Sequence, residues 1–201
     1  MKRALAVVLA CAGAAVLCAV FLISRHRPAS PDTRKQEATA PDSPPALSVP
    51  VLCYHRFGGD GKGMAISADL FEEHLAWMKE NGFRSISLND LRRFLSGDMR
   101  NLPEKPVLIT VDDGYRSYLE VGHPLLKKYG FSAVLFVYPD FISRGTAALT
   151  WEELRSLVAD GIEIGSHSFT HANLTTLAAR APSGELAHLL SKEIVSSRKE
   201  I

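Results

Sequence analysis

The chain has 201 residues, enough for one domain with additional segments. Its 23 basic and 22 acidic side chains give a formal net charge of +1, but the charge is unevenly placed. The first 27 residues hold four basic residues and no acid, so the remainder carries 19 basic and 22 acidic side chains, a net charge of −3. A mildly acidic body has no broad positive field for phosphate backbones, which argues against nucleic-acid binding.

Residues 1–27 are predicted to be a membrane anchor or a signal segment. Residues 4–23 are 20 consecutive small or apolar residues, long enough to cross a hydrocarbon core of about 30 Å as a helix. An uncleaved anchor fits better than a cleaved signal peptide, because the small-x-small sites at 12–14 and 38–40 lie too early and too late. A lipoprotein cleavage site before Cys11 is a weaker alternative. We expect the body on the extracytoplasmic face, or secreted if the segment is cleaved.

Residues 28–46 are predicted to be a flexible linker, because they are rich in proline and polar residues and offer no apolar surface to bury. Beyond the linker, Cys53 is the only cysteine. No disulfide can therefore form within the body.

From residue 47 onward, short apolar runs alternate with helical patterns. Strands are predicted over residues 49–54, 84–86, 107–111, 132–138 and 162–165, and helices over 67–81, 89–95, 118–129, 150–160 and 184–201. This alternation predicts an α/β fold with a parallel sheet and helices outside it. Five strands are too few for a closed barrel, which typically has eight strands and about 250 residues. We therefore expect an incomplete barrel.

Three polar clusters each follow a predicted strand. His55 follows the first strand, Asp112 and Asp113 follow the third, and His167 and His171 follow the last. Because the carboxyl ends of parallel strands open onto one face, these side chains are expected to converge on one pocket.

Two imidazoles and one carboxylate are a common ligand set for an open zinc site. Adjacent carboxylates at a strand end point in different directions, so one can bind a metal while the other acts as a general base. In isolation, Asp-Asp-Gly at residues 112–114 could equally be a turn, and the His-x-x-x-His spacing could be two unrelated surface histidines. Their shared position at strand ends favours a metal site.

Two of these segments carry a family resemblance. Residues 110–114 (Thr-Val-Asp-Asp-Gly) and 167–171 (His-Ser-Phe-Thr-His) resemble the first two motifs of the polysaccharide deacetylases related to the rhizobial chitooligosaccharide deacetylase. Residues 51–55 and 105–110 are similar to the branch that deacetylates poly-β-1,6-N-acetylglucosamine. Val111 stands where the family usually has phenylalanine. The resemblance implies a distorted (β/α) barrel.

The resemblance also implies a role for each matching residue. Asp113, His167 and His171 would bind a divalent metal, most plausibly zinc, and Asp112 would be the general base. Ser168 would brace the histidine loop, and His55 would line the substrate pocket, or be only a hydrogen-bonded histidine at a strand end. No role is expected for Tyr115, Arg116 or Tyr138, and His74 and His123 are predicted to be surface residues.

The implied activity is hydrolysis of N-acetyl groups from an extracytoplasmic N-acetylglucosamine polymer. Alternatives are a non-catalytic carbohydrate-binding domain on the same fold and an esterase that removes acetyl groups from xylan. Later family motifs, with an arginine, an acetyl pocket and a histidine general acid, do not occur before Ile201. Residues 47–201 are thus expected to be the N-terminal portion of the catalytic domain, either in a fragment of a longer protein or in a truncated gene product.

Overall fold

The computed structural model describes residues 48–59 and 61–201, which belong to a single unit spanning Pro45–Ile201. The predicted anchor or signal segment (1–27) and the predicted linker (28–46) lie outside the described residues. Within the described part of the chain, no helix combines the length and the apolar character needed to cross a membrane.

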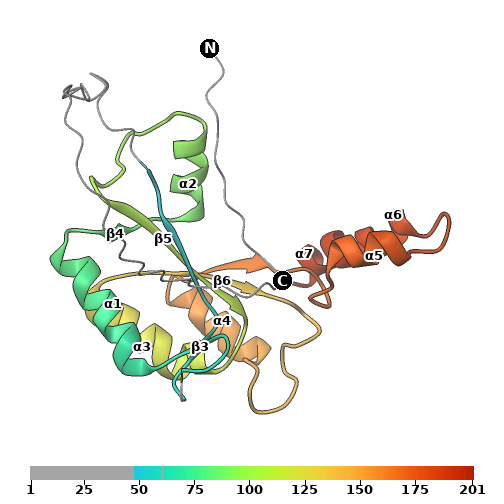
Figure 1. The fold of residues 1–201 in the computed structure, drawn as a ribbon, viewed down its shortest axis with the longest axis horizontal. Helices are drawn as coiled ribbons and strands as arrows, with labels where there is room; N and C mark the ends of the chain where they lie inside the picture. Colours follow the sequence, from blue (N-terminus) through green and yellow to red (C-terminus); the bar gives the residue numbers. More distant parts are fainter. Residues whose placement is uncertain (1–47, 60) are drawn as a thin grey trace, which may run out of the picture. The chain divides into compact units, whose positions relative to one another are not determined.

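A parallel sheet organises the domain, as the alternation of strands and helices predicts (Figure 1). Its strands are β1 (Val51–Tyr54), β4 (Arg84–Ser85), β5 (Pro106–Asp113), β6 (Val134–Val137) and β7 (Glu163–Ser166). The order along the sheet is β1-β5-β6-β7, and β4 also pairs with β5. Two short strands outside the prediction, β2 (Arg56–Phe57) and β3 (Ala65–Ile66), pair with each other.

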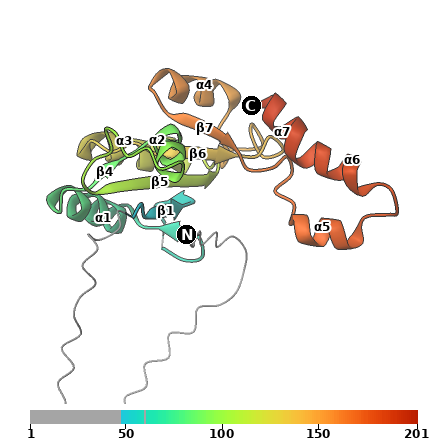
Figure 2. The same ribbon diagram turned by 90° about the horizontal axis from the view of Figure 1, so that it is seen from above.

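Helices follow most of the strands. They are α1 (Ala68–Glu80), α2 (Leu88–Leu95), the π-helical turn η1 (Tyr118–Gly122), α3 (His123–Tyr129), α4 (Trp151–Ala159), α5 (Leu174–Arg180), α6 (Leu186–Leu190), the π-helical turn η2 (Ser191–Ser196) and α7 (Ser197–Glu200). Figure 2 shows that α5, α6 and α7 project beyond the end of the sheet at which β6 and β7 finish. The predicted helical tail consists of α6, η2 and α7. Helix α5 was not predicted.

Local sequence explains where several helices begin and end. Ser67 caps α1 by accepting a hydrogen bond from the Leu70 backbone N–H, and Thr150 and Glu153 form the predicted capping box of α4. The left-handed Gly130 (φ 76°) ends α3. These features confirm the predicted boundaries to within one or two residues.

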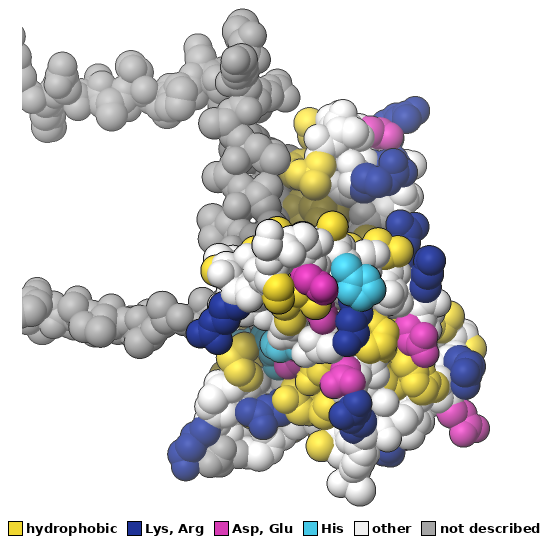
Figure 3. Space-filling view, turned by 90° about the vertical axis from the view of Figure 1, so that its right-hand side faces the viewer, with side chains coloured by type: hydrophobic (Ala, Val, Ile, Leu, Met, Phe, Trp, Pro, Cys, Tyr) yellow, Lys and Arg dark blue, Asp and Glu magenta, His cyan; other side chains and the backbone are white. Residues whose placement is uncertain are grey.

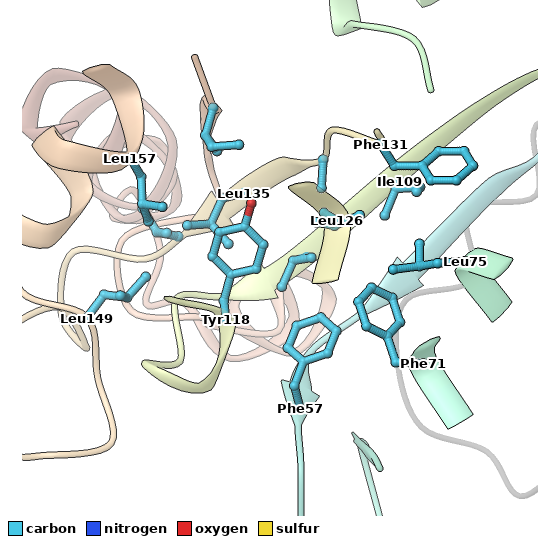
Figure 4. Close-up of a cluster of buried hydrophobic side chains, with 14 of the residues drawn as sticks. Phe57, Phe71, Leu75, Ile109, Tyr118, Leu126, Phe131, Leu135, Leu149 and Leu157 are labelled. Atoms are coloured by element: carbon cyan, nitrogen blue, oxygen red, sulfur yellow. The ribbon is translucent and has the colours of Figure 1, made fainter. Parts of the chain in front are cut away.

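The core lies between the sheet and its outer helices. Every residue of β5 is buried, which accounts for its β-branched run at Val107, Ile109 and Val111. Figure 4 shows aromatic and aliphatic side chains from α1, β5, β6 and α4 packing around this strand. The labelled members of this cluster are Phe57, Phe71, Leu75, Ile109, Tyr118, Leu126, Phe131, Leu135, Leu149 and Leu157. The core therefore holds β5, and the residues at its end, in place.

Strand β5 extends further than its sequence predicts. Asp112 and Asp113 continue the ladder, paired with Phe136 and Val137 of β6, instead of forming a turn after Val111. Pairing with β6 thus holds two carboxylates at the sheet's carboxyl edge.

Charges on the exposed surface are mixed. On the face drawn in Figure 3, Lys and Arg side chains lie among Asp and Glu side chains and hydrophobic patches. That face presents no continuous surface of one sign.

Candidate metal centre and active site

Strand register brings the second polar cluster beside the third. Asp113 pairs with Val137 of β6, and Val137 in turn pairs with Ser166 of β7. The His167 backbone N–H donates to the Val137 carbonyl oxygen at 2.8 Å, so His167 continues the ladder by one residue. Neighbouring strands are about 4.8 Å apart, so β5 and β7 lie about 10 Å apart, a distance that two facing side chains can span across β6.

Asp113, His167 and His171 each turn one donor atom toward the same point. Asp113 Oδ1 lies 3.6 Å from His167 Nε2 and 3.4 Å from His171 Nε2. All three donor atoms lie within 4.8 Å of one another. Bonds of about 2.0–2.2 Å to a tetrahedral zinc would separate its ligand atoms by about 3.4 Å. The residues present fit a divalent cation.

The buried carboxylates lack the hydrogen bonds that burial ordinarily requires. Asp112 and Asp113 are 6% and 8% exposed, yet the Oδ1 atom of each has no hydrogen-bond partner among the described residues. Leaving such atoms unsatisfied costs about 1–3 kcal/mol each, and more when the group is charged. A cation beside Asp113 would offset that cost.

Strained backbone occurs at three of the site residues. Asp113, Ser168 and His171 have φ values of 78°, 65° and 60°, in the left-handed region that most L-residues avoid. Such conformations cost about 1–3 kcal/mol and persist where the surroundings impose them, commonly at functional sites.

Two glycines allow the strand ends to approach closely. A Cβ on Gly114 would lie 2.8 Å from Ile142 Cδ1, and Gly114 also has a φ of 88°. A Cβ on Gly165 would lie 2.4 Å from the ring of Phe136. Both distances are below any real contact, so a larger residue would displace the segment carrying a site residue.

The protonation of His167 suits metal binding. Burial lowers the pKa of this imidazole, the charge of His171 acts in the same direction, and the carboxylate of Asp112 opposes them. A lowered pKa keeps the ring neutral near pH 7, the form that binds metal. His171 is the more open ligand, with about half of its side chain exposed.

A buried glutamate holds the histidine loop. Glu193 of η2 is 5% exposed and accepts hydrogen bonds from the backbone N–H groups of Phe169 and Thr170 at 3.1 and 2.9 Å. The Thr170 hydroxyl donates to the same carboxylate at 2.8 Å. Burial acts to raise the pKa of Glu193, but the hydrogen bonds from Thr170 and Phe169 outweigh it, and the pKa is lowered. Glu193 therefore fixes the segment between the two histidines.

Ser197, one helical turn later, completes this support. Its hydroxyl donates to the Ser168 carbonyl at 2.8 Å and lies 2.6 Å from the Ser166 hydroxyl.

Sequence reasoning missed both Glu193 and Ser197, since a glutamate and a serine in an exposed helical tail carry no distinguishing signal. Ser168 lies in this loop, and its side chain also contributes to lowering the pKa of Glu193. The bracing role predicted for Ser168 stays a prediction.

Tyr138, for which no role was expected, stacks on a candidate ligand. Its ring centroid lies 5.1 Å from that of His171, with an interplanar angle of 30°. The ring of Phe141 also stacks on Tyr138, with the centroids 5.3 Å apart. Tyr138 follows β6 directly, the same signal that singled out the other strand-end residues. It supports the orientation of His171.

The remaining histidines are placed differently. His55 is half-buried at the end of β1, near Cys53 and Asp112. His74 is exposed on α1, as predicted. The prediction that His123 is a surface residue was wrong: it is 8% exposed, packs against Tyr118, and its Nε2 lies 3.2 Å from Asp160.

Comparison with known proteins agrees with this geometry. Residues 99–192 match the family model described as polysaccharide deacetylase. Over this segment the chain is a polysaccharide deacetylase match. Among curated proteins, it is 32% identical over 139 residues to the "Putative polysaccharide deacetylase YxkH" of Bacillus subtilis. It is also 35% identical over 75 residues to the poly-β-1,6-N-acetyl-D-glucosamine N-deacetylase of Escherichia coli K12.

These matches cover unequal shares of each protein. The YxkH match takes in 69% of this chain and 49% of that protein, and the Escherichia coli match 37% and 11%. The chain thus spans about half the length of YxkH and a much smaller part of the Escherichia coli enzyme.

Solved structures share the fold. The Streptococcus pyogenes deacetylase PplD in complex with acetate matches with a TM-score of 0.65 at 24% identity, covering 76% of this chain and 67% of that one. IcaB from Ammonifex degensii matches with a TM-score of 0.62 at 27% identity, covering 74% and 66%. The Bacillus cereus polysaccharide deacetylase BC0361 gives 0.60 at 25%, covering 76% and 46%. The predicted fold, a parallel α/β sheet of the distorted-barrel deacetylase type, is confirmed.

Proposed function

We propose that this chain carries the metal-binding part of a hydrolase that removes N-acetyl groups from an extracytoplasmic N-acetylglucosamine polymer. The observation that carries the proposal is the convergence of Asp113, His167 and His171, with Asp112 beside them. The match to the polysaccharide deacetylase family model and similarity to a poly-β-1,6-N-acetyl-D-glucosamine N-deacetylase support the substrate class.

Asp113, His167 and His171 would hold a divalent cation, for which zinc suits two imidazoles and one carboxylate. Such a cation polarises a carbonyl and lowers the pKa of bound water to about 7. One carboxylate and two neutral imidazoles leave the centre with a net positive charge. That charge preserves its strength as a Lewis acid.

Asp112 is the proposed general base. Its Oδ2 lies 3.8 Å from His167 Nε2, which places it beside the cation's ligands without contributing to them. Its Oδ1 has no hydrogen-bond partner among the described residues and is free to accept a proton from the attacking water. The His171 side of the site is open, so an acetamide group has a route to the centre.

The general acid and the acetyl-binding groups are proposed to lie outside residues 1–201, because the chain spans about half the length of YxkH. The full-length protein is therefore the form to assay. We also propose that residues 1–27 attach the domain to the outer side of the membrane. Protease treatment of intact cells, followed by detection of the domain, tests this placement.

Product analysis tests the reaction. The full-length protein, incubated with poly-β-1,6-N-acetylglucosamine, is expected to release acetate and to create free amines in equal amounts. Acetate release from acetylated xylan without amine formation would identify an esterase instead. Failure to release acetate from either polymer while metal is bound would favour a carbohydrate-binding role.

A further inference from the structure

A second set of metal-ligand side chains lies beside the first. Cys53, His55 and Asp112 each offer one donor atom, and these three atoms lie within 4.8 Å of one another. The set shares no residue with Asp113, His167 and His171.

Strand register explains how this set forms. Tyr54 of β1 is level with Val111 of β5, so His55 comes level with Asp112. Cys53 and His55 are two residues apart, so their side chains point to the same face of the sheet. The side chain of Asp112, which is level with His55, points to that face too. Asp113, the next residue along, belongs to the other donor set. Adjacent aspartates thus serve two neighbouring clusters.

Distances within this set suit a soft cation. The Cys53 Sγ atom donates a hydrogen bond to Asp112 Oδ2 at 3.4 Å. Zinc bonds of about 2.3 Å to sulfur and about 2.0–2.2 Å to oxygen, at tetrahedral angles, separate these two atoms by about 3.6 Å. A thiolate, an imidazole and a carboxylate together favour zinc or cadmium over hard ions such as magnesium.

Two further features make this set accessible and incomplete. Cys53 is exposed and His55 is half-buried, so an ion can enter from solvent. Asp112 is only 6% exposed, and its Oδ1 atom has no hydrogen-bond partner among the described residues. A cation would satisfy that buried carboxylate.

We propose that Cys53, His55 and Asp112 form a second, inhibitory site for a soft divalent cation. Occupation of this site engages Asp112, so its carboxylate can no longer accept a proton. The inhibitory consequence rests on the proposed function, in which Asp112 is the general base. The binding itself does not.

Electrostatics predict that this site fills after the first. Asp112 Oδ2 lies 3.8 Å from His167 Nε2, so two cations would be close neighbours. Two divalent ions bring four positive charges, whereas Asp112, Asp113 and a Cys53 thiolate bring three negative charges. Repulsion between the ions therefore weakens the binding of the second ion. Inhibition is therefore expected only when the metal exceeds one equivalent.

The test uses full-length metal-free protein in a Cys11→Ser/Cys18→Ser background, so that Cys53 is the only thiol among residues 1–201. Cadmium is titrated while the ultraviolet thiolate-to-cadmium absorption band and the number of bound ions are recorded. The parent is expected to bind two ions, with the thiolate band growing mainly during the second equivalent. Excess cadmium is expected to stop deacetylation.

Cys53→Ser is the informative variant, with Cys53→Ala as a second in case serine disturbs the fold. Either variant is expected to lose the thiolate band and to bind the second ion at least about tenfold more weakly. Even a change in a residue that only supports a ligand lowers metal affinity by about 10–100-fold. Inhibition, measured relative to each variant's own rate with one equivalent of metal, should require correspondingly more cadmium.

His171→Ala is the matched control, because it removes a ligand of the first set only. It should lose turnover yet keep the thiolate band. If the protein never deacetylates its polymer but the band appears and depends on Cys53, the proposed function fails and the second site stands. A parent without a thiolate band, or Cys53 variants inhibited as strongly as the parent, overturns the second site.

Discussion

Asp113 Oδ1 and His171 Nε2 lie 3.4 Å apart, although Asp113 ends β5 and His171 lies in the loop after β7, on the other side of β6. This separation is close to the spacing of two ligand atoms on one tetrahedral zinc. The parallel register of β5, β6 and β7, together with the left-handed backbone at both residues, produces it. The predictions below begin from this pair.

Asp113→Asn and Asp112→Asn are expected to have different effects. An amide in place of Asp113 removes the only anionic ligand of the first set, so the variant should lose its metal and its activity. Asp112→Asn should retain one equivalent of metal and lose turnover by about 10²–10⁴-fold, the usual contribution of a general base. Metal content measured beside acetate release checks both. Loss of the metal from Asp112→Asn would exchange the two roles.

Glu193→Ala is expected to weaken metal binding from a distance. It leaves the Phe169 and Thr170 backbone N–H groups without their acceptor, and the histidine loop loses its support. Second-shell losses of this kind cost about 10–100-fold in metal affinity. Glu193→Gln is the matched control, because its carbonyl can still accept these bonds, and it should bind metal more tightly than the alanine variant. Equal affinities in the parent and both variants would show that Glu193 has no positioning role.

The same carboxylate predicts a pH dependence of stability. The pKa of Glu193 is lower in the folded protein than its ordinary value of 4.5. Its ionised form therefore stabilises the fold above about pH 4.5, and this contribution disappears as the pH falls through the lowered folded pKa. The difference in unfolding free energy between the parent and Glu193→Gln should be constant near neutral pH and shrink below about pH 4. A difference that grows on acidification would contradict the assignment.

Much of the fold can be predicted from local sequence. The capping box of α4, the stop at Gly130 and the β-branched run of β5 each act within a few residues, so the pattern alone locates them. The five strands of the sheet and the strand-end position of the ligand candidates follow from the same signals. The parallel arrangement then requires the three clusters to meet.

Other features depend on tertiary contacts that no local pattern carries. Asp112 and Asp113 continue β5 because β6 offers them partners, although Asp-Asp-Gly alone favours a turn. Glu193 and Ser197 acquire their role only because the helical tail folds back onto the histidine loop. His123 is buried by its contacts with Tyr118 and Asp160, which lies 37 residues further along the chain. Each of these residues has an ordinary sequence context.

Gly165→Ala is expected to destabilise the domain by about 1–3 kcal/mol, as overpacking a core position does. The new Cβ would lie 2.4 Å from the Phe136 ring, immediately before the segment that carries His167. Phe136→Leu removes the ring edge, so the double variant should lose less than the sum of the two single changes. Chemical denaturation of the four proteins measures this coupling. Strict additivity would mean that the ring of Phe136 does not restrict position 165.

Metal removal is expected to lower thermal stability. A cation bound to the folded state alone stabilises it by mass action, by about 2.7 kcal/mol at one hundred times its dissociation constant. Chelator treatment should lower the melting temperature of the parent, and zinc should restore it. His167→Ala, combined with Cys53→Ser to disable the second set, should melt at the same temperature with and without chelator. A chelator effect that persists in this variant would place the stabilising ion elsewhere.

The most direct test of the account is zinc X-ray absorption on the full-length protein loaded with one equivalent. Asp113, His167 and His171 predict a first shell of nitrogen and oxygen at about 2.0–2.2 Å with the scattering signature of two imidazoles. His171→Ala should reduce that signature to one imidazole. A sulfur neighbour at about 2.3 Å in the parent, or no zinc retained at all, would contradict the assignment.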